Sequence, residues 1–462
     1  MRSHLRILLI AIFLSGLSFG AAEAKSKSSA PSREALLEQR LEELEQKQKV
    51  LERNLELKEE AEKEKAKDKP VIKASSGGIS IGSADGNNEI RFRGLIQADA
   101  RFYLDRDGQG AVNTFIARRI RPYIEGRFAK RWDFRIMPDF GEGKVVLQDA
   151  WINTTIFPEL KVQLGKFKEP VGLERLESAS ALHFVERGFP TELAPNRDLG
   201  VMLNGEILDG VLNYQAGVFN GVFDGGSADF DINNSKDFAG RVFAHPFKKT
   251  SIEPLQKLGI GVSGSVGQGT GTLTDPQLGT YKTPGRQTWF SYINTPGTNV
   301  VFADGERWRV SPQGYYYYKG FGLLGEYIVS SQKVNGVGAV APVAIQNQAW
   351  QIAANYVIGA DNSFGNIKPR KPLGWKKGGT GAFEFGVRYN EAKIDQDAFP
   401  LFADPNKSAR KAKNWGVAFN WIINENAKLY IDFEQTHFDG GGKGGTDKKT
   451  ENVILNRYQL NF

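Results

Sequence analysis

A strict alternation of apolar and basic residues between Phe115 and Phe140 limits what this chain can fold into. The stretch reads FIARRIRPYIEGRFAKRWDFRIMPDF; every second residue is mostly apolar, and several arginines lie between. A period of two places successive side chains on opposite faces of a β-strand. In a soluble sandwich the apolar face would pack on a second sheet. In a transmembrane barrel it would face lipid, and the arginines would line a water-filled lumen.

Segments with the same alternation recur through the rest of the chain, from about Asn88 to the last residue. They are separated by connections rich in glycine and aspartate, which is the pattern of an outer-membrane barrel. We count about sixteen such segments, an even number as bacterial single-chain barrels have. The sequence therefore predicts an all-β fold, a transmembrane antiparallel β-barrel of about 16 strands over residues 89–462. Aromatic residues near strand ends are the expected interfacial girdles, namely Trp132, Tyr316, Tyr318, Trp415 and Trp421.

Both ends of the chain carry export features. Arg2 and Arg6 precede an apolar run that ends at Ala22-Glu23-Ala24, which is typical of a cleaved signal peptide over residues 1–24. The run is shorter than the roughly 20 apolar residues that span a bilayer, which argues against a membrane anchor. The chain ends in Phe462 after an alternating strand, which resembles the signal read by the barrel assembly machinery. We therefore expect insertion into the outer membrane of a Gram-negative bacterium.

The segment 25–69 differs from the rest in composition, being rich in Glu, Lys, Leu and Gln. Ser32 is a suitable N-cap for a helix. Steps of four and three form a short heptad seam, which comprises Leu37, Leu41, Leu44, Gln48, Leu51 and Leu55. The seam favours a short oligomeric coiled coil over a solvated single helix. Residues 70–88, with Pro70 and a Ser-Ser-Gly-Gly run, are expected to be a linker.

Arginines recur on the face opposite the apolar residues, which in a barrel is the lumen. A low-dielectric tube lined with permanently charged guanidinium groups concentrates anions and repels cations. The alternative is that individual arginines only pair with acidic residues on neighbouring strands. The expected lumen ladder comprises Arg91, Arg93, Arg101, Arg121, Arg127, Arg135, Arg241, Arg309 and Arg388.

A long connection follows the strand that ends near Phe167. Loops of this length are usually functional or internally structured. We expect the connection, around residues 168–196, to fold into the lumen, where Lys168, Arg175 and Arg187 would narrow the passage. The alternative is an external loop with no role in conduction.

Four motifs carry a resemblance to a known family. They are ARRIRPYIEG followed by Trp132-Asp133-Phe134, LQDAWI from Leu147, GKFKEPVGLERLESA from Gly165, and the terminal YQLNF. With these the chain resembles the phosphate-selective porin O and P family over residues 89–462. The resemblance implies a sixteen-stranded trimeric outer-membrane porin, an arginine ladder, and a third loop folded inward to form an anion site.

The family's site residues transfer by position. The paired arginines correspond to Arg118 and Arg119, and the loop's basic and hydroxyl members to Arg175 and Ser178. The later Glu-Arg pair of the loop ends in Arg187, and the acidic member falls at Gln148 or Asp149. Strict alternation would send Arg118 outward beside an inward Arg119, so we expect a β-bulge at this point.

The function expected from the sequence is passive diffusion of small anions, most of all phosphate, pyrophosphate or polyphosphate. A general anion or small-solute porin without phosphate preference is one alternative. A barrel hydrolase is disfavoured because no nucleophile and base occur in a catalytic arrangement. A plugged barrel whose helix grips peptidoglycan is a further alternative. We expect outer-membrane lipid and a homotrimer as partners, and no catalytic residue, metal, cofactor or nucleic acid.

Overall fold

The computed structural model describes residues 32–104, 111–231, 233–374 and 378–462. It divides into two compact units, a helical segment up to Lys67 and a barrel unit from Asp68 onward. The expected signal peptide, residues 1–24, lies outside the described residues.

The helical unit holds one long helix, α1 (Arg33–Asp68). Ser32 caps it, because its hydroxyl accepts a hydrogen bond from the Ala35 N–H at 3.3 Å. The seam leucines are exposed in the single chain, with Leu41 at 61% and Leu44 at 64%. The helix is as predicted, and its assembly into a coiled coil stays a prediction. No helix among the described residues is long and apolar enough to cross a membrane.

Part of the segment predicted as a linker, residues 70–88, is instead a β-hairpin. Strands β1 (Val71–Ser75) and β2 (Gly78–Gly82) pair antiparallel. β2 also pairs antiparallel with the first residues of β3 (Glu89–Tyr103), with Ile79 opposite Phe92. Gly78 has a φ of +97°, a conformation that glycine adopts at little steric cost. The Ser-Ser-Gly-Gly run therefore closes a tight turn.

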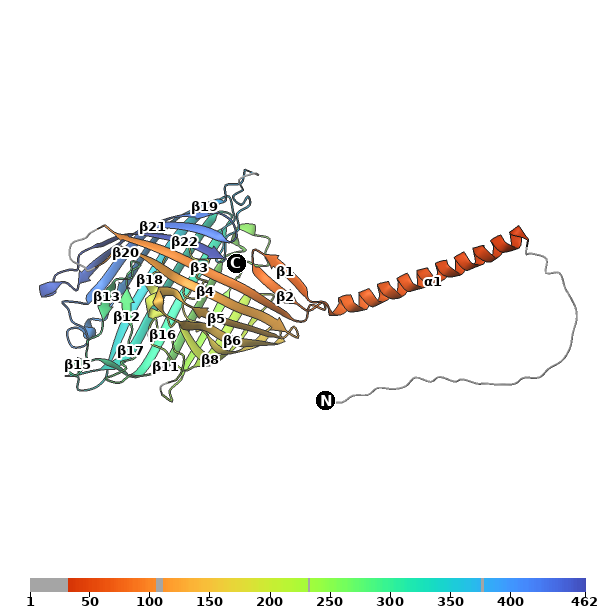
Figure 1. Cartoon of the computed structure of the whole chain (residues 1–462). Coiled ribbons are helices and arrows are strands. Elements are labelled where there is room, and N and C mark those ends of the chain that lie inside the picture. Colours follow the sequence, from red (N-terminus) through yellow and green to blue (C-terminus); the bar gives the residue numbers. More distant parts are fainter. Residues whose placement is uncertain (1–31, 105–110, 232, 375–377) are drawn as a thin grey trace, which may run out of the picture. The chain divides into compact units, whose positions relative to one another are not determined.

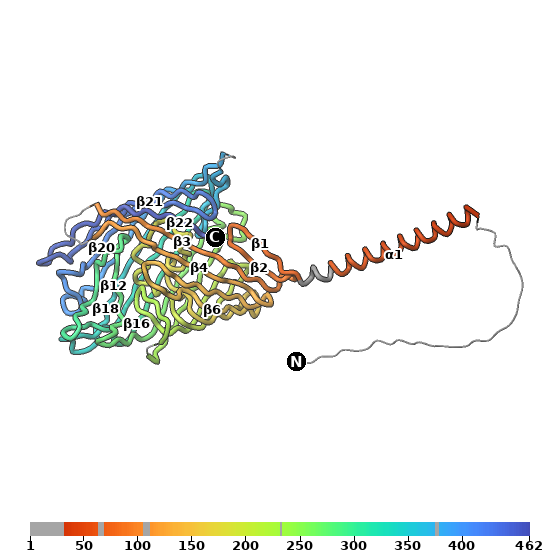
Figure 2. Tube along the Cα trace, in the orientation of Figure 1, coloured from red at the N-terminus to blue at the C-terminus, as the bar shows by residue number. Residues whose placement is uncertain are grey.

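Sixteen strands of the described chain form a closed antiparallel barrel (Figures 1 and 2). They are β3 (Glu89–Tyr103), β4 (Thr114–Phe128), β5 (Trp132–Asp139), β6 (Val146–Phe157), β7 (Leu160–Lys168), β8 (Arg197–Ile207), β9 (Leu212–Phe219), β10 (Asp237–Ala244), β11 (Gly259–Thr270), β16 (Phe302–Tyr318), β17 (Phe321–Asn335), β18 (Val343–Ile358), β19 (Ala382–Lys393), β20 (Ala409–Ile422), β21 (Ala427–Gly440) and β22 (Glu451–Asn461). β22 closes the barrel on β3, with Arg457 opposite Asp99. Phe462 extends the seam through two backbone hydrogen bonds with Gly94, at 2.7 and 3.0 Å. The predicted strand number is confirmed.

The two faces of the barrel wall differ as the alternation predicts. In β19, buried and less buried residues alternate along the strand. Apolar side chains such as Phe385 (50%) and Val387 (56%) stay exposed on the outer surface, which in a membrane faces lipid. Trp132 and Trp415, two of the expected girdle residues, are also exposed, at 47% and 38%.

Connection length distinguishes the two ends of the barrel. At the inner end most turns are short, such as 129–131 and 319–320, whereas 245–258 and 359–381 are longer. At the outer end the longest connections are 169–196, 220–236, 271–301 and 394–408. Short turns mark the periplasmic side of such barrels and long loops the extracellular side. The connections contain α2 (Pro190–Leu193), β12 (Thr280–Lys282), β13 (Thr288–Ser291), β14 (Asn294–Thr295), β15 (Asn299–Val300), η1 (Gly141–Gly143), η2 (Glu253–Leu255), η3 (Gln396–Ala398) and η4 (Lys443–Gly445).

Candidate functional site

The third loop, residues 169–196, lies inside the barrel. Its backbone N–H groups donate to inward-facing side chains of β17, β21 and β19: Leu173 to Glu326 at 2.7 Å, Val185 to Asp432 at 2.6 Å, and Phe189 to Asn390 at 3.1 Å. The first two of these bonds have carboxyl acceptors, and hydrogen bonds to ionised carboxylates are among the stronger ones in proteins; the third has a neutral amide acceptor. One side of the barrel wall therefore holds the loop in place.

An apolar core fixes the loop at the outer end. Phe189 and Leu193 of the third loop are buried together with Trp289 and Phe290, which belong to the connection 271–301. The rings of Phe189 and Trp289 lie 5.8 Å apart. Two infolded connections thus fill the outer part of the lumen beside the wall that holds them.

A cavity of about 860 Å³ lies in the lumen beside the infolded connections. It reaches from Lys144 and Lys282 in outer connections to Phe364 and Asn461 at the inner end. Its barrel wall comes mainly from β3 to β10, and the third loop forms the facing side. Thirteen Lys and Arg residues line it against six Asp and Glu, a formal surplus of seven positive charges. A passage of this composition attracts anions.

All six residues predicted for the site line this cavity: Arg118, Arg119, Asp149, Arg175, Ser178 and Arg187. The structure also has the bulge expected at the arginine pair, since Gln97 pairs with Arg119 while Ala98 pairs with Ala117. Arg118 is the extra residue and turns inward. Residue 141 must be small here, because a Cβ on Gly141 would lie 2.5 Å from the Arg118 carbonyl oxygen.

The two arginines of β4 have polar partners already. Arg118 binds Glu186 through Nε at 2.6 Å and Nη2 at 3.2 Å. Arg119 is buried, donates to the Gln97 amide oxygen at 2.6 Å, and lies 3.9 Å from Glu186. Glu186 therefore offsets part of the charge of this pair.

Three other cations around the third loop are not neutralised in this way. Within the described chain, no carboxylate lies within 4 Å of the side-chain nitrogens of Lys168, Arg175 or Arg187. They are held by carbonyl oxygens instead: Lys168 donates to Glu177 at 2.8 Å, Arg187 to Glu174 and Glu177 at 2.8 and 2.7 Å, and Arg175 to Thr191. Carbonyl partners orient these groups and leave their net charge in place.

Asp149, the expected acidic member, is paired with two arginines. It accepts a hydrogen bond from Arg197 Nε at 2.8 Å and lies 3.7 Å from Arg135. Sequence reasoning missed Arg197, which begins the strand after the third loop. Its position directly after the long connection could have indicated its role, because the first residue of the following strand lies at the outer end of the barrel wall beside the third loop.

The structure places the arginines of the predicted lumen ladder in three different settings. Arg93, Arg121, Arg135 and Arg241 line the cavity. Arg101, Arg309 and Arg388 are buried and paired with carboxylates, for example Arg388 with Glu434 at 2.7 Å. They stabilise the packed side of the lumen, because the infolded connections cover them. Arg91 and Arg127 are exposed near the inner end and pair with Glu89 and Asp133, both at 2.6 Å.

A closed sixteen-stranded barrel with an apolar outer surface and a loop folded into a charged lumen defines a porin of the Gram-negative outer membrane. The sequence model named phosphate-selective porin O and P matches residues 90–462, and the chain belongs to this family. No match was found among curated proteins.

Two solved structures of outer-membrane proteins share the fold. The channel DcaP of Acinetobacter baumannii is 10% identical, with 84% of this chain and 99% of that chain covered and a TM-score of 0.52. OmpT of Vibrio cholerae, expressed in the outer membrane, is 12% identical, with coverage of 81% and 98% and a TM-score of 0.51. An anion-selective porin from Comamonas acidovorans is 11% identical, with coverage of 81% and 100% and a TM-score of 0.48.

Proposed function

We propose that this porin passes small anions by passive diffusion and binds phosphate or polyphosphate where the third loop faces the wall. The observation that carries the proposal is the group of cations with carbonyl partners only, Lys168, Arg175 and Arg187. An anion entering the cavity meets charges that no carboxylate of the described residues offsets within 4 Å.

The arrangement of hydrogen-bond donors supports a specific anion-binding site in addition to attraction by the overall positive charge. A guanidinium group carries five N–H donors, and Arg187 uses two of its nitrogens, Nε and Nη2, on loop carbonyls. Among the described residues, Nη1 of Arg187 and Nη1 of Arg175 have no hydrogen-bond partner, and both residues line the cavity, so these groups can donate to an oxyanion. Planar donor forks suit phosphate, which accepts paired hydrogen bonds.

A general anion porin without phosphate preference is the second candidate. Ion pairs along the cavity favour it: Arg121 lies 2.7 Å from Asp139, and Arg118 and Arg197 are paired with Glu186 and Asp149. Such pairs lower the number of guanidinium groups that are free to hold one anion. The passage would then select by charge alone.

A transport role, rather than catalysis, agrees with the family and with the surroundings of the polar residues. The Ser178 hydroxyl lies 2.9 Å from the hydroxyl of Ser180. His183, a residue of the third loop, is buried, and its Nδ1 contacts the carboxyl group of Glu384 on β19. A general base must reach the proton that it abstracts, and this histidine is engaged elsewhere.

Phosphate block of the chloride current tests the proposal. Single channels in a planar bilayer should pass chloride, and phosphate added at rising concentration should reduce that current saturably. A site delays the bound anion, whereas a charged lining alone does not. Chloride current that phosphate leaves unchanged would favour the general anion porin.

A further inference from the structure

The connection between β18 and β19 is unusually long for the inner end of the barrel. It spans residues 359–381, where such barrels have short turns. Ile367 is buried with Val357, Ala382 and Ile422, which fixes the first part of the connection against the wall. Phe364 and Asn366 then reach the cavity. The connection therefore contributes side chains to the inner part of the passage.

Phe364 completes an aromatic cluster beside Arg241. Its ring stacks on Tyr315 with 4.9 Å between centroids and 18° between planes, and Tyr315 lies 5.1 Å from Phe243. The Arg241 guanidinium carbon sits 4.3 Å above the Phe243 ring. A guanidinium group over an aromatic face is held by the ring quadrupole and keeps its in-plane donors free.

Arg241 is a further cation of the lumen without an acidic partner. Its Nε donates to the Gln313 amide oxygen at 3.1 Å, and among the described residues no carboxylate oxygen lies within 4 Å of its side-chain nitrogens. Arg241 also lines the cavity. It belongs to β10, whereas Lys168 ends β7 and Arg175 and Arg187 belong to the third loop.

Aromatic side chains also interrupt the charged lining of the cavity. Tyr123, Trp151 and Phe364 line it. Arg93 and Arg135 lie over the Tyr123 ring and Arg135 over the Trp151 ring, whereas no guanidinium group of the described residues lies over Phe364. Apolar side chains that expose area to a water-filled chamber gain from contact with an apolar ligand. The cavity as a whole is lined mainly by charged and polar residues, so an apolar group of a ligand has Phe364 and few other side chains to contact.

We propose that Arg241 and Phe364 form a second anion-binding site, for a carboxylate carried on an aromatic ring. The carboxylate accepts hydrogen bonds from the guanidinium group of Arg241, and the ring lies against Phe364. Aromatic rings prefer offset or edge contacts with one another, which the exposed part of Phe364 offers. The site is independent of the phosphate site proposed at the third loop.

Competition with the chloride current tests the proposal, with benzoate as the probe and acetate as the probe without a ring. In the wild type, benzoate should block at a concentration at least about tenfold lower than acetate, since burying a ring adds more than 1.4 kcal/mol. Arg241→Gln should weaken the benzoate block about tenfold or more, and Phe364→Ala should bring benzoate close to acetate. Phe364→Leu, which keeps the bulk of the residue, controls for movement of the connection and should retain unit conductance.

Variants at the third loop separate the two sites. Lys168→Gln should weaken phosphate block and leave benzoate block within about twofold, whereas Arg241→Gln should do the reverse. Equal block by benzoate and acetate in the wild type would overturn the proposal. So would a benzoate block that Arg241→Gln leaves unchanged, or one that Lys168→Gln removes to the same extent.

Discussion

Replacing Lys168 by glutamine tests the proposed phosphate site with little change to the loop. The ammonium group lines the cavity and donates to the Glu177 carbonyl oxygen at 2.8 Å. A glutamine amide also donates, so the contact that orients the loop is retained while the charge is lost. The comparison therefore isolates the contribution of charge to anion binding.

The size of the effect follows from the type of hydrogen bond that is lost. A bond to a charged group contributes about 1.5–3 kcal/mol and a neutral bond about 0.5–1.5 kcal/mol. The difference, about 1–1.5 kcal/mol, corresponds to a ~5–12-fold weaker phosphate block, because 1.4 kcal/mol is a factor of ten. Phosphate titration against single-channel chloride current in 0.1 M salt measures this ratio.

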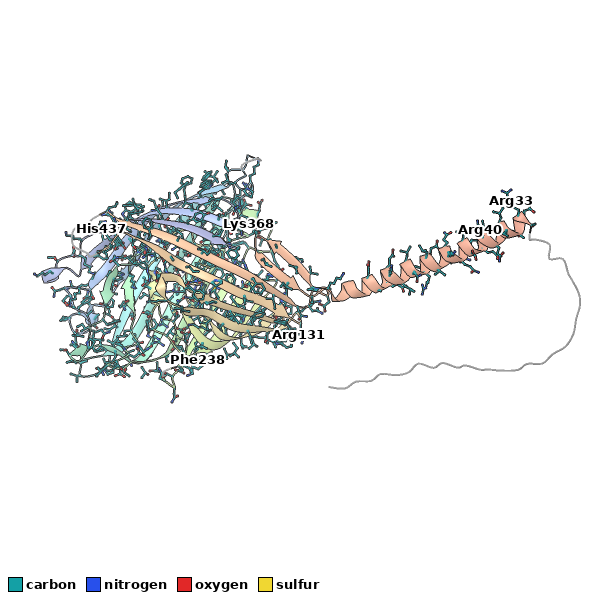
Figure 3. The ribbon with its side chains drawn as sticks, viewed as in Figure 1. Arg33, Arg40, Arg131, Phe238, Lys368 and His437 are labelled. Atoms are coloured by element: carbon teal, nitrogen blue, oxygen red, sulfur yellow. The ribbon has the colours of Figure 1, made fainter. Side chains whose placement is uncertain are left out.

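Arg131→Gln is the matched control. Arg131 is exposed in the inner-end turn between β4 and β5 (Figure 3) and does not line the cavity. The substitution removes one positive charge, as Lys168→Gln does. The field of the Arg131 charge is screened over about 10 Å at 0.1 M salt. We expect a change below about twofold. If phosphate blocks the Lys168→Gln channel as strongly as it blocks the wild type or the Arg131→Gln channel, the assignment of Lys168 to the site is wrong.

Three further predictions concern other parts of the chain. Arg119→Ala should weaken phosphate block at least about tenfold. Arg119→Lys should weaken it too, because lysine keeps the positive charge and loses the planar pair of N–H donors. If phosphate blocks the lysine variant as strongly as the parent, only the electrostatic field of the residue matters. Arg309→Ala should leave phosphate block unchanged but lower the free energy of unfolding by about 3–5 kcal/mol, because Arg309 is buried and lies 2.8 Å from Asp224. The variant should therefore unfold at a lower temperature in detergent, and equal unfolding temperatures would contradict this. Deleting residues 32–69 should leave heat-resistant homotrimers on a gel, since three heptads add little to a contact between barrels, and monomers would show that the helix holds the assembly.

The barrel and the infolded loop follow from local patterns in the sequence. A period of two is a property of each strand by itself, so the sixteen strands could be counted without knowing their partners. The unusual length of the connection after Phe167 indicated an inward fold. The bulge at Arg118 could also be predicted, because two adjacent arginines cannot both face the lumen on a regular strand.

The ion-pair partner of each arginine could not be predicted, because it depends on contacts between residues that lie far apart in the sequence. Arg457 meets Asp99 across the barrel seam at 2.7 Å, and Arg388 meets Glu434 on a different strand. Alternation fixes the face of a side chain and not its partner. The same limit applies to the connection 359–381, because its contact between Phe364 and Tyr315 joins residues that lie far apart in the sequence.

The zero-current potential across a potassium chloride gradient tests the central claim most directly. The cavity lining has thirteen basic residues against six acidic ones, so the potential should have the anion-selective sign at low salt. Its magnitude should fall as salt rises, because the screening length drops from about 10 Å at 0.1 M to roughly 3 Å at 1 M. A cation-selective sign would contradict the assignment of the lumen and, with it, the proposed function.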